Sequence, residues 1–132
     1  MMGIRQNVVR DENLMVSYAV VNGWTTVEVD GGVDVHTAPM IRDAVFTLLD
    51  EGHIHFVLDL GFVSFMDSTG LGAVIATTKR VRGRGGSLRI ACATRRVLRV
   101  FEIAALRDSY EFYPSLEDAI RSSPVAESPH FS

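Results

Sequence analysis

Cysteine is almost absent from this chain, and no apolar run is long enough to cross a membrane. Cys92 is the single cysteine in 132 residues, which excludes an internal disulfide framework and a zinc site built from several cysteines. The longest apolar stretches, such as residues 71–76, fall far short of the roughly 18–20 residues that span a bilayer. Residues 1–14 lack the apolar core of a secretory signal. We therefore expect a cytoplasmic protein.

Lysine is equally scarce, since Lys79 is the only one beside 12 arginines. The formal net charge is −3 at pH 7, so the chain as a whole is neither a polyanion nor a polycation. A nucleic-acid-binding role would therefore require a local basic patch. Apolar residues make up 47% of the chain and charged residues 22%, which is typical of a globular protein. A length of 132 residues predicts one domain.

Turn signals and hydrophobic periodicity divide the chain into three parts. Residues 1–13 predict a loose lead-in, residues 14–121 the folded domain, and residues 122–132, polar and interrupted by prolines, a disordered tail. Within the domain we expect strands at 14–21, 24–29, 54–60, 87–93 and 110–113, and helices at 37–51, 69–82, 95–105 and 115–121. A hairpin turn at Asn22-Gly23, followed by alternating strands and helices, indicates an α/β fold with a mixed sheet.

The segment at residues 65–72, Phe-Met-Asp-Ser-Thr-Gly-Leu-Gly, joins a core strand to a helix. Either Asp67 or Ser68 can cap that helix. The first turn of a helix leaves N–H groups unpaired and carries a partial positive charge, which favours an anion. Ser68 and Thr69 place two hydroxyls there, and the glycines that follow leave them unshielded. Alternatively, the segment is an ordinary helix cap whose glycines only allow close packing. The P-loop pattern G-x-x-x-x-G-K-[ST] is missing.

This segment and its neighbours resemble, in the same order, the anti-sigma factor antagonists, which are single-domain STAS proteins. Asp-Ser-Thr-Gly-Leu-Gly at 67–72 looks like the phosphorylation-site motif of that family. The other matching segments are the loop 31–38, the strand and lead-in 57–67, Gly85-Gly86 with the strand that follows, and the helix 97–106. The resemblance covers roughly residues 14–121.

The resemblance implies a STAS-like α/β fold, a mixed β-sheet with helices packed mainly on one face. It implies that the chain binds an anti-sigma factor with serine kinase activity and thereby releases a sigma factor. The kinase would phosphorylate Ser68 and so switch the protein off, and a phosphatase would restore it. The docking surface implied by the family motif comprises Asp34, Met66, Asp67, Thr69, Gly70 and Leu71. A phosphate adds about −1.5 to −2 charges, which would repel an acidic partner surface.

Two positions depart from the family pattern. Gly32 stands where the family commonly has a glutamate, which removes one acidic side chain from the first loop, although Asp34 remains. Thr69 replaces the second serine of many relatives and keeps the hydroxyl. The implied role is regulatory: the protein is not an enzyme, needs no cofactor or metal, and contacts neither nucleic acid nor membrane directly.

The residues alone leave two other function classes open. A small hydrolase or transferase could use Ser68 as its nucleophile, but the chain lacks the G-x-S-x-G elbow and a recognised triad order. A nucleic-acid-binding module could use the window 68–101, which contains no acidic residue. The basic residues of this arginine window are Lys79, Arg80, Arg82, Arg84, Arg89, Arg95, Arg96 and Arg99. They can also steer an acidic partner, or lie on solvated faces of three different elements.

Three further residues carry weaker signals. His53 and His55 would share one face of a strand, but no third metal ligand lies nearby in the sequence. Cys92 alternates with Ile90 in a predicted strand, so we expect a buried and unreactive thiol.

Overall fold

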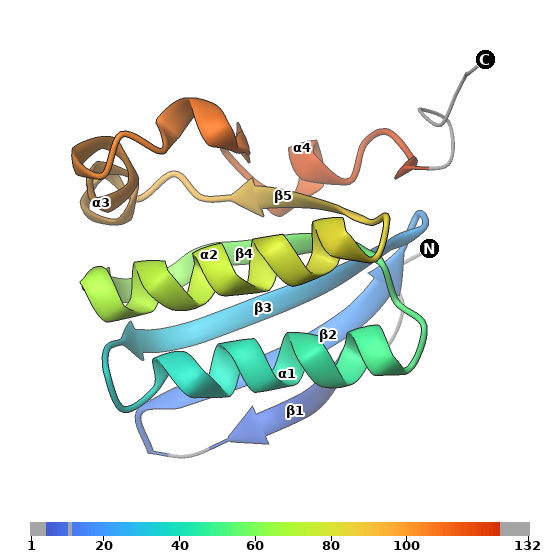
Figure 1. Ribbon diagram of the computed structural model, residues 1–132, viewed down its shortest axis with the longest axis horizontal. Coiled ribbons are helices and arrows are strands. Elements are labelled where there is room, and N and C mark those ends of the chain that lie inside the picture. Colours follow the sequence, from blue (N-terminus) through green and yellow to red (C-terminus); the bar gives the residue numbers. More distant parts are fainter. Residues whose placement is uncertain (1–4, 11, 125–132) are drawn as a thin grey trace.

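The computed structural model describes residues 5–10 and 12–124. These residues form one six-stranded mixed sheet whose spatial order equals the chain order, β1-β2-β3-β4-β5-β6 (Figure 1). The strands are β1 (Gln6–Arg10), β2 (Leu14–Val21), β3 (Trp24–Val33), β4 (His55–Met66), β5 (Ser87–Ala91) and β6 (Glu111–Tyr113). The helices are α1 (Ala38–Asp50), α2 (Ser68–Gly83), α3 (Arg95–Ile103), the 3₁₀ turn η1 (Arg107–Ser109) and α4 (Leu116–Ala119). The predicted α/β fold with a mixed sheet is confirmed.

The antiparallel half of the sheet begins earlier than the sequence predicted. β1 pairs with β2, although residues 1–13 were expected to form a loose lead-in. That prediction was wrong for residues 6–10, because an edge strand owes its structure to its partner rather than to its own apolar pattern. The predicted turn between β2 and β3 is confirmed. Asn22 and Gly23 have φ values of 53° and 84°, as a two-residue type I′ turn requires.

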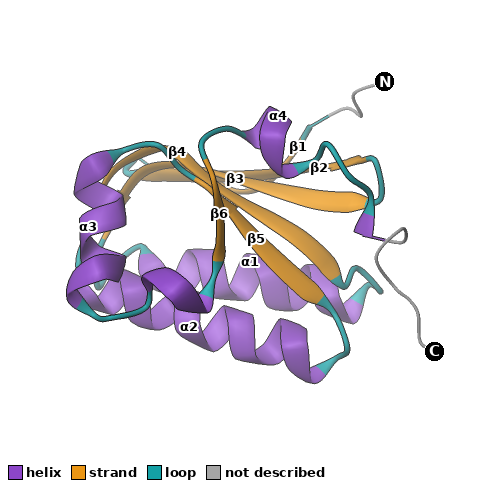
Figure 2. Cartoon of the chain, turned by 90° about the horizontal axis from the view of Figure 1, so that it is seen from above, coloured by secondary structure: helices purple, strands orange, loops and turns teal. Residues whose placement is uncertain are grey.

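The parallel half explains why the large helices share one face. β3, β4, β5 and β6 are parallel, and each crossover moves one position in the same direction across the sheet. Such crossovers are right-handed. When successive crossovers run in the same direction across a sheet, the helices within them therefore lie on the same face of that sheet. Figure 2 shows α1 and α2 below the sheet and the short α4 above it. Among the described strands the order never reverses, so the sheet has no topological switch point, where α/β folds usually bind small ligands.

The main core lies between the sheet and the α1–α2 layer. α1 buries one apolar stripe of Ile41, Ala44, Val45, Leu48 and Leu49. Side chains from α2, α3 and the inner sheet face complete the same cluster. Each fully buried leucine or valine contributes about 1.5–3 kcal/mol relative to exposure. This layer therefore fixes α1 and α2 side by side. None of the described helices is long and apolar enough to cross a membrane.

Several element boundaries differ from the sequence-based predictions. β3 continues to Val33 instead of ending at residue 29, and β4 continues to Met66 instead of ending at residue 60. The two strands stay paired over this extension through two irregularities in register. Asp30, Gly31 and Gly32 in β3 and Gly61 in β4 are typical of strand ends, which is why the sequence predicted earlier ends. The two strands continue past these residues because their backbones pair with each other.

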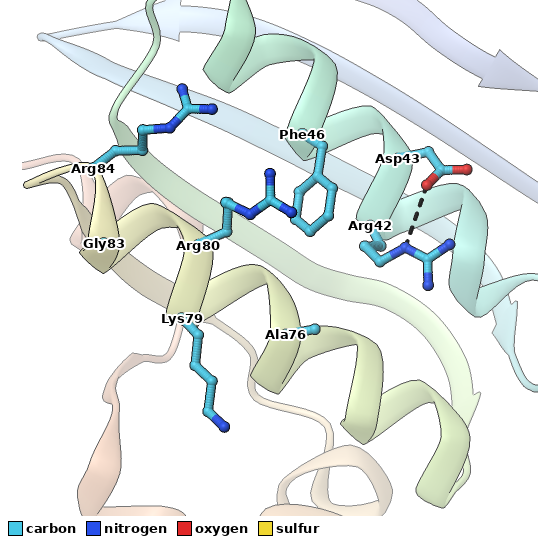
Figure 3. A pocket seen from close by; sticks show the side chains of 8 residues that line it. All are labelled: Arg42, Asp43, Phe46, Ala76, Lys79, Arg80, Gly83 and Arg84. Atoms are coloured by element: carbon cyan, nitrogen blue, oxygen red, sulfur yellow. Dashed lines mark hydrogen bonds and ion pairs between the residues drawn. The ribbon is translucent and has the colours of Figure 1, made fainter.

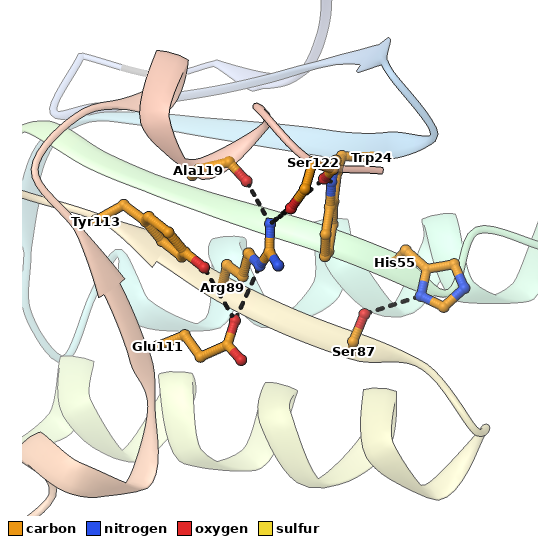
Figure 4. A network of polar contacts seen from close by, with 8 residues as sticks. All are labelled: Trp24, His55, Ser87, Arg89, Glu111, Tyr113, Ala119 and Ser122. Atoms are coloured by element: carbon orange, nitrogen blue, oxygen red, sulfur yellow. Dashed lines mark hydrogen bonds and ion pairs between the residues drawn. The ribbon is translucent and has the colours of Figure 1, made fainter. Parts of the chain in front are cut away.

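The opposite face of the sheet carries a smaller cluster around a buried arginine (Figure 4). Arg89 is only 5% exposed, so the expectation that the whole arginine window lies on solvated faces was wrong for this residue. Its guanidinium lies 4.5 Å from the Trp24 ring centroid and 5.0 Å from that of Tyr113. It donates hydrogen bonds to Glu111 (2.9 Å) and to the carbonyl of Ala119 (2.8 Å). Arg89 therefore ties α4 to the sheet.

The ordered chain continues past the predicted domain end at residue 121. The Trp24 indole N–H donates to the carbonyl of Ser122 at 2.8 Å, and the Asn22 side chain donates to the carbonyl of Ile120 at 2.7 Å. Pro124 is buried. The tail prediction was therefore wrong for residues 122–124, and residues 125–132 lie outside the described part of the chain.

Candidate partner-binding site

Two loops meet at the carboxyl edge of the parallel strands. Val33, the last residue of β3, is paired with Met66, the last residue of β4. The Asp67 backbone N–H donates to the Val33 carbonyl at 3.1 Å. The loop before α1 and the turn before α2 therefore lie side by side, so residues far apart in the sequence share one surface.

Asp34 organises the first loop. Its Oδ1 accepts hydrogen bonds from the backbone N–H groups of His36 (2.9 Å) and Thr37 (3.1 Å). The Thr37 hydroxyl in turn donates to the Gly32 carbonyl at 2.7 Å, so Thr37 stabilises the loop rather than capping α1 with its side chain. The hydrogen bond from the His36 N–H is the main cause that holds the pKa of Asp34 below its usual value. The Asp34 carboxylate is therefore charged at neutral pH.

Asp67, and not Ser68, caps α2. Its Oδ1 accepts a hydrogen bond from the Gly70 N–H at 2.9 Å, while its backbone stays extended. Ser68 is the first residue of the helix, and both Ser68 and Thr69 are exposed. The Ser68 hydroxyl therefore does not cap the helix, and it is open to solvent at the positive end of a helix dipole.

The two glycines of the turn have different surroundings. A Cβ on Gly70 would lie 2.7 Å from a Val33 methyl group and 2.8 Å from the Met66 side chain. Gly70 thus allows α2 to begin directly against the end of β3, which is the packing role the sequence left open. A Cβ on Gly72 would meet nothing within 4 Å. Packing therefore explains Gly70 but not Gly72.

The structure divides the predicted docking residues into exposed and supporting ones. Asp67, Ser68 and Thr69 are exposed and Asp34 is partly exposed. The three apolar or small members, Met66, Gly70 and Leu71, are buried. They hold the turn from beneath and present little surface to a partner.

The structure explains why residue 32 is a glycine. A Cβ at this position would lie 2.3 Å from the Phe65 ring, so the aromatic ring occupies the space over Gly32. Phe65 is 41% exposed, and Val35 on the neighbouring loop is 59% exposed. Sequence reasoning missed both as surface residues. The departure at Gly32 was the available signal, because a missing side chain leaves room for another group.

The remaining candidate residues do not assemble into a second site. His53 Nδ1 is hydrogen-bonded to the Thr25 hydroxyl at 2.7 Å, and His55 Nδ1 to the Ser87 hydroxyl at 2.9 Å. No group of three possible metal ligands occurs among the described residues. Cys92 is buried, as predicted, and burial raises the pKa of its thiol. Within the described chain, the Ser68 hydroxyl has no hydrogen bond to a histidine or carboxylate that would activate it as a nucleophile.

Comparison with known proteins identifies the family to which this geometry belongs. The model of the STAS domain matches residues 15–119, a range that runs from β2 to the end of α4 and includes both loops. The chain belongs to the STAS domain family. Its curated STAS relatives include the anti-sigma-B factor antagonist of Bacillus subtilis, 35% identical over 95 residues, which are 72% of this chain and 86% of that protein. The anti-sigma-B factor antagonist of Staphylococcus epidermidis is 32% identical over 96 residues, 73% of this chain and 89% of that protein.

Solved STAS structures share the fold. An anti-sigma factor antagonist from Mycobacterium paratuberculosis superposes with a TM-score of 0.76 at 24% identity, covering 86% of this chain and 97% of that one. The anti-sigma factor antagonist SpoIIAA in its unphosphorylated form has a TM-score of 0.66 at 21% identity, covering 89% of this chain and 93% of that one. The expected STAS-like arrangement is therefore confirmed.

Proposed function

We propose that this STAS protein is an anti-sigma factor antagonist that phosphorylation of Ser68 switches off. In this proposal it binds an anti-sigma factor with serine kinase activity, which releases a sigma factor. The kinase then phosphorylates Ser68, and a phosphatase reverses the modification. The observation that carries the proposal is the exposed Ser68 hydroxyl at the start of α2, beside the charged Asp34 loop.

The surroundings of Ser68 suit an on–off switch. The positive end of the α2 dipole accepts a phosphate without disturbing the helix. Asp67 and Asp34 already carry negative charge on the same surface, so a phosphate of about −1.5 to −2 charges concentrates repulsion toward any acidic partner surface. The modification therefore changes the surface and leaves the fold intact.

The proposal predicts that Ser68→Ala stays folded, binds the kinase and is not phosphorylated. Because Asp67 provides the cap, removing the Ser68 hydroxyl costs at most a few tenths of a kcal/mol, and alanine is the better helix former. Unphosphorylated protein is immobilised to capture partners from a lysate of the source cells. The captured kinase is then purified and incubated with ATP, and the phosphate is mapped by mass spectrometry.

Thr69→Ala is the matched control, because it removes the adjacent exposed hydroxyl from the same helical turn. It should remain phosphorylatable on Ser68. Ser68→Asp should weaken kinase binding, although one charge imitates a phosphate incompletely. Phosphate found on Thr69 with Ser68 unmodified would contradict the assignment.

A further inference from the structure

A groove runs between α1 and α2, starting at the first turn of α2. Its narrow part, about 230 Å³, is lined by residues that include Thr69 and Gly72. Its wide part, about 800 Å³, extends toward the C-terminal end of α2 (Figure 3). Arg42 and Ala76 line both parts, so the two form one continuous depression. Because Thr69 follows Ser68 directly, the groove begins one residue from the proposed phosphoacceptor.

The wide part of the groove is basic, although the chain has a net charge of −3. Four of its eight lining residues are cationic and one is acidic; the cations are Arg42, Lys79, Arg80 and Arg84. Two of them are paired within the chain, Arg42 with Asp43 at 3.3 Å and Arg84 with Asp50 at 3.1 Å. Exposed ion pairs of this kind contribute little free energy, so a partner's carboxylates can compete for both arginines. Figure 3 shows the four cationic side chains spaced along the two helices and not converging on a single point, with Arg80 directed toward Phe46 of α1 and Lys79 directed away from α1. Such spacing fits a row of carboxylates on an extended partner better than one compact anion.

The basic residues of the arginine window therefore lie in different parts of the fold. Lys79, Arg80 and Arg84 belong to the groove, whereas Arg89 is buried on the opposite face of the sheet. The single aromatic side chain that lines the groove, Phe46, is covered by the Arg80 guanidinium at 4.2 Å from the ring centroid. A nucleic acid would lack a free ring on which to stack its bases. The groove thus favours an acidic protein over single-stranded nucleic acid.

Gly72 supplies an independent observation in the narrow part of the groove. It lies inside α2, where glycine is less favourable than alanine, and it is exposed with open space around its Cα. Its missing side chain keeps the groove open next to the phosphoacceptor. An approaching backbone needs such an opening.

We propose that the α1–α2 groove is the docking site for an acidic segment of the anti-sigma factor kinase. This inference rests on the proposed function and specifies its partner. The segment enters over Gly72, next to Ser68, and places its carboxylates along Arg42, Lys79, Arg80 and Arg84. The groove then brings the kinase to Ser68 and orients it there.

The test compares two charge reversals of equal size with the purified kinase as the probe. Lys79→Glu/Arg80→Glu alters the groove, whereas Arg95→Glu/Arg96→Glu alters exposed arginines on α3 and serves as the control. Association rates are measured by stopped flow at two salt concentrations. The groove variant should associate at least about tenfold more slowly at low salt and lose most of its salt dependence. The control should change by less than about threefold.

Gly72→Ala provides a second variant whose folding is not in question. It should melt at a temperature equal to or above that of the unaltered protein, and should bind the kinase at least about fivefold more weakly, because the new methyl group narrows the groove. A binding loss with unchanged or raised stability separates docking from unfolding. Unaltered kinase binding by Gly72→Ala and by the groove variant would overturn the inference.

Phosphate mapping at saturating kinase distinguishes the two proposals. If Ser68 is phosphorylated in every variant and the groove variant associates no more slowly than the control, the docking inference fails and the proposed function stands. If the unaltered protein neither binds the kinase nor receives phosphate on Ser68, both fail. Tight binding of a 30-nucleotide single-stranded DNA at about 150 mM salt, lost in the groove variant, would assign the groove to nucleic acid and also overturn the inference.

Discussion

At the scale of single residues, Asp67 has a structural task that is separate from partner recognition. Its carboxylate satisfies the Gly70 N–H, and its backbone N–H binds the end of β3. Asp67 therefore sets the position at which α2 begins, and so the position of the Ser68 hydroxyl. A change at Asp67 acts on the site through geometry as well as charge.

Asp67→Ala should lower the free energy of unfolding by about 0.5–2 kcal/mol, because it removes the cap of α2. Asp67→Ser keeps an oxygen that can cap the helix, and should recover most of the loss. Urea unfolding monitored by circular dichroism measures both variants. Equal stability of Asp67→Ala and the unaltered protein would show that the cap contributes nothing.

The choice between Asp67 and Ser68 as the cap could not be made from the sequence. Both residue types are good caps, and the answer depends on where β4 ends. The backbone pairing of β3 with β4 carries the strand to Met66, which leaves Asp67 as the first residue outside it. The exposure of the Ser68 hydroxyl thus follows from the extension of β4 to Met66, which the side-chain pattern did not predict. The ring of Phe65 over Gly32 is a similar case, since it depends on the register between two strands.

At the scale of elements, the segment after α4 is part of the domain. The carbonyl of Ser122 accepts from the Trp24 indole, and Arg89 is also within 3.3 Å of the Ser122 hydroxyl. The first contact joins positions 98 residues apart and the second joins positions 33 apart, whereas the local sequence after residue 121 is polar and short of apolar residues. Local pattern therefore indicated a tail, and only the tertiary contacts place residues 122–124 in the fold.

Two truncations test this boundary. Ending the chain after Arg121 removes the acceptor of the Trp24 indole and the buried Pro124, and should cost about 1–2 kcal/mol. For a domain of this size each kcal/mol corresponds to roughly 3–6 °C in melting temperature. Ending the chain after Pro124 keeps these contacts and should leave the melting temperature nearly unchanged. Equal melting of the two truncated chains in a calorimeter would argue against this role for residues 122–124.

The regular elements were easier to predict than these contacts. The helix predicted at 37–51 and the turn at Asn22-Gly23 both depend on neighbours a few residues away, and the structure confirms both. β1 depends on pairing with β2 and escaped prediction. Sequence patterns thus recovered the fold class and the family motif, because both rest on local signals.

At the scale of the whole molecule, the free energy of unfolding should depend on pH through two carboxylates whose pKa values are shifted in opposite directions. Asp59 is 6% exposed, and burial raises its pKa above the usual 3.8. The folded state therefore binds this proton more tightly than the unfolded state, and the stability it contributes is lost as pH rises from about 3.8 through the raised pKa. Asp34 has a lowered pKa, so its contribution is present above 3.8 and is lost as pH falls through the lowered value.

Asp59→Asn should accordingly be more stable than the unaltered protein at neutral pH, and the difference should vanish in acid. The amide oxygen can still accept the hydrogen bond that the Gly61 N–H gives to Asp59. Asp34→Asn, the comparison variant, should be less stable at neutral pH and converge with the unaltered protein in acid. Urea midpoints from about pH 3 to neutral pH measure both differences. A parallel pH dependence of the two variants would contradict the assigned pKa directions.

The sequential order of the sheet also bears on how the chain acquires its structure during synthesis. Each strand pairs with the one that precedes it in the chain, so no strand has to insert between two that are already joined. As the chain leaves the ribosome, the β1–β2–β3 meander can form first and each later strand can add at the growing edge. The acceptors of Arg89 and Trp24 at Ala119 and Ser122 emerge last. The contacts that secure the far edge of the sheet therefore form only when the domain is fully translated.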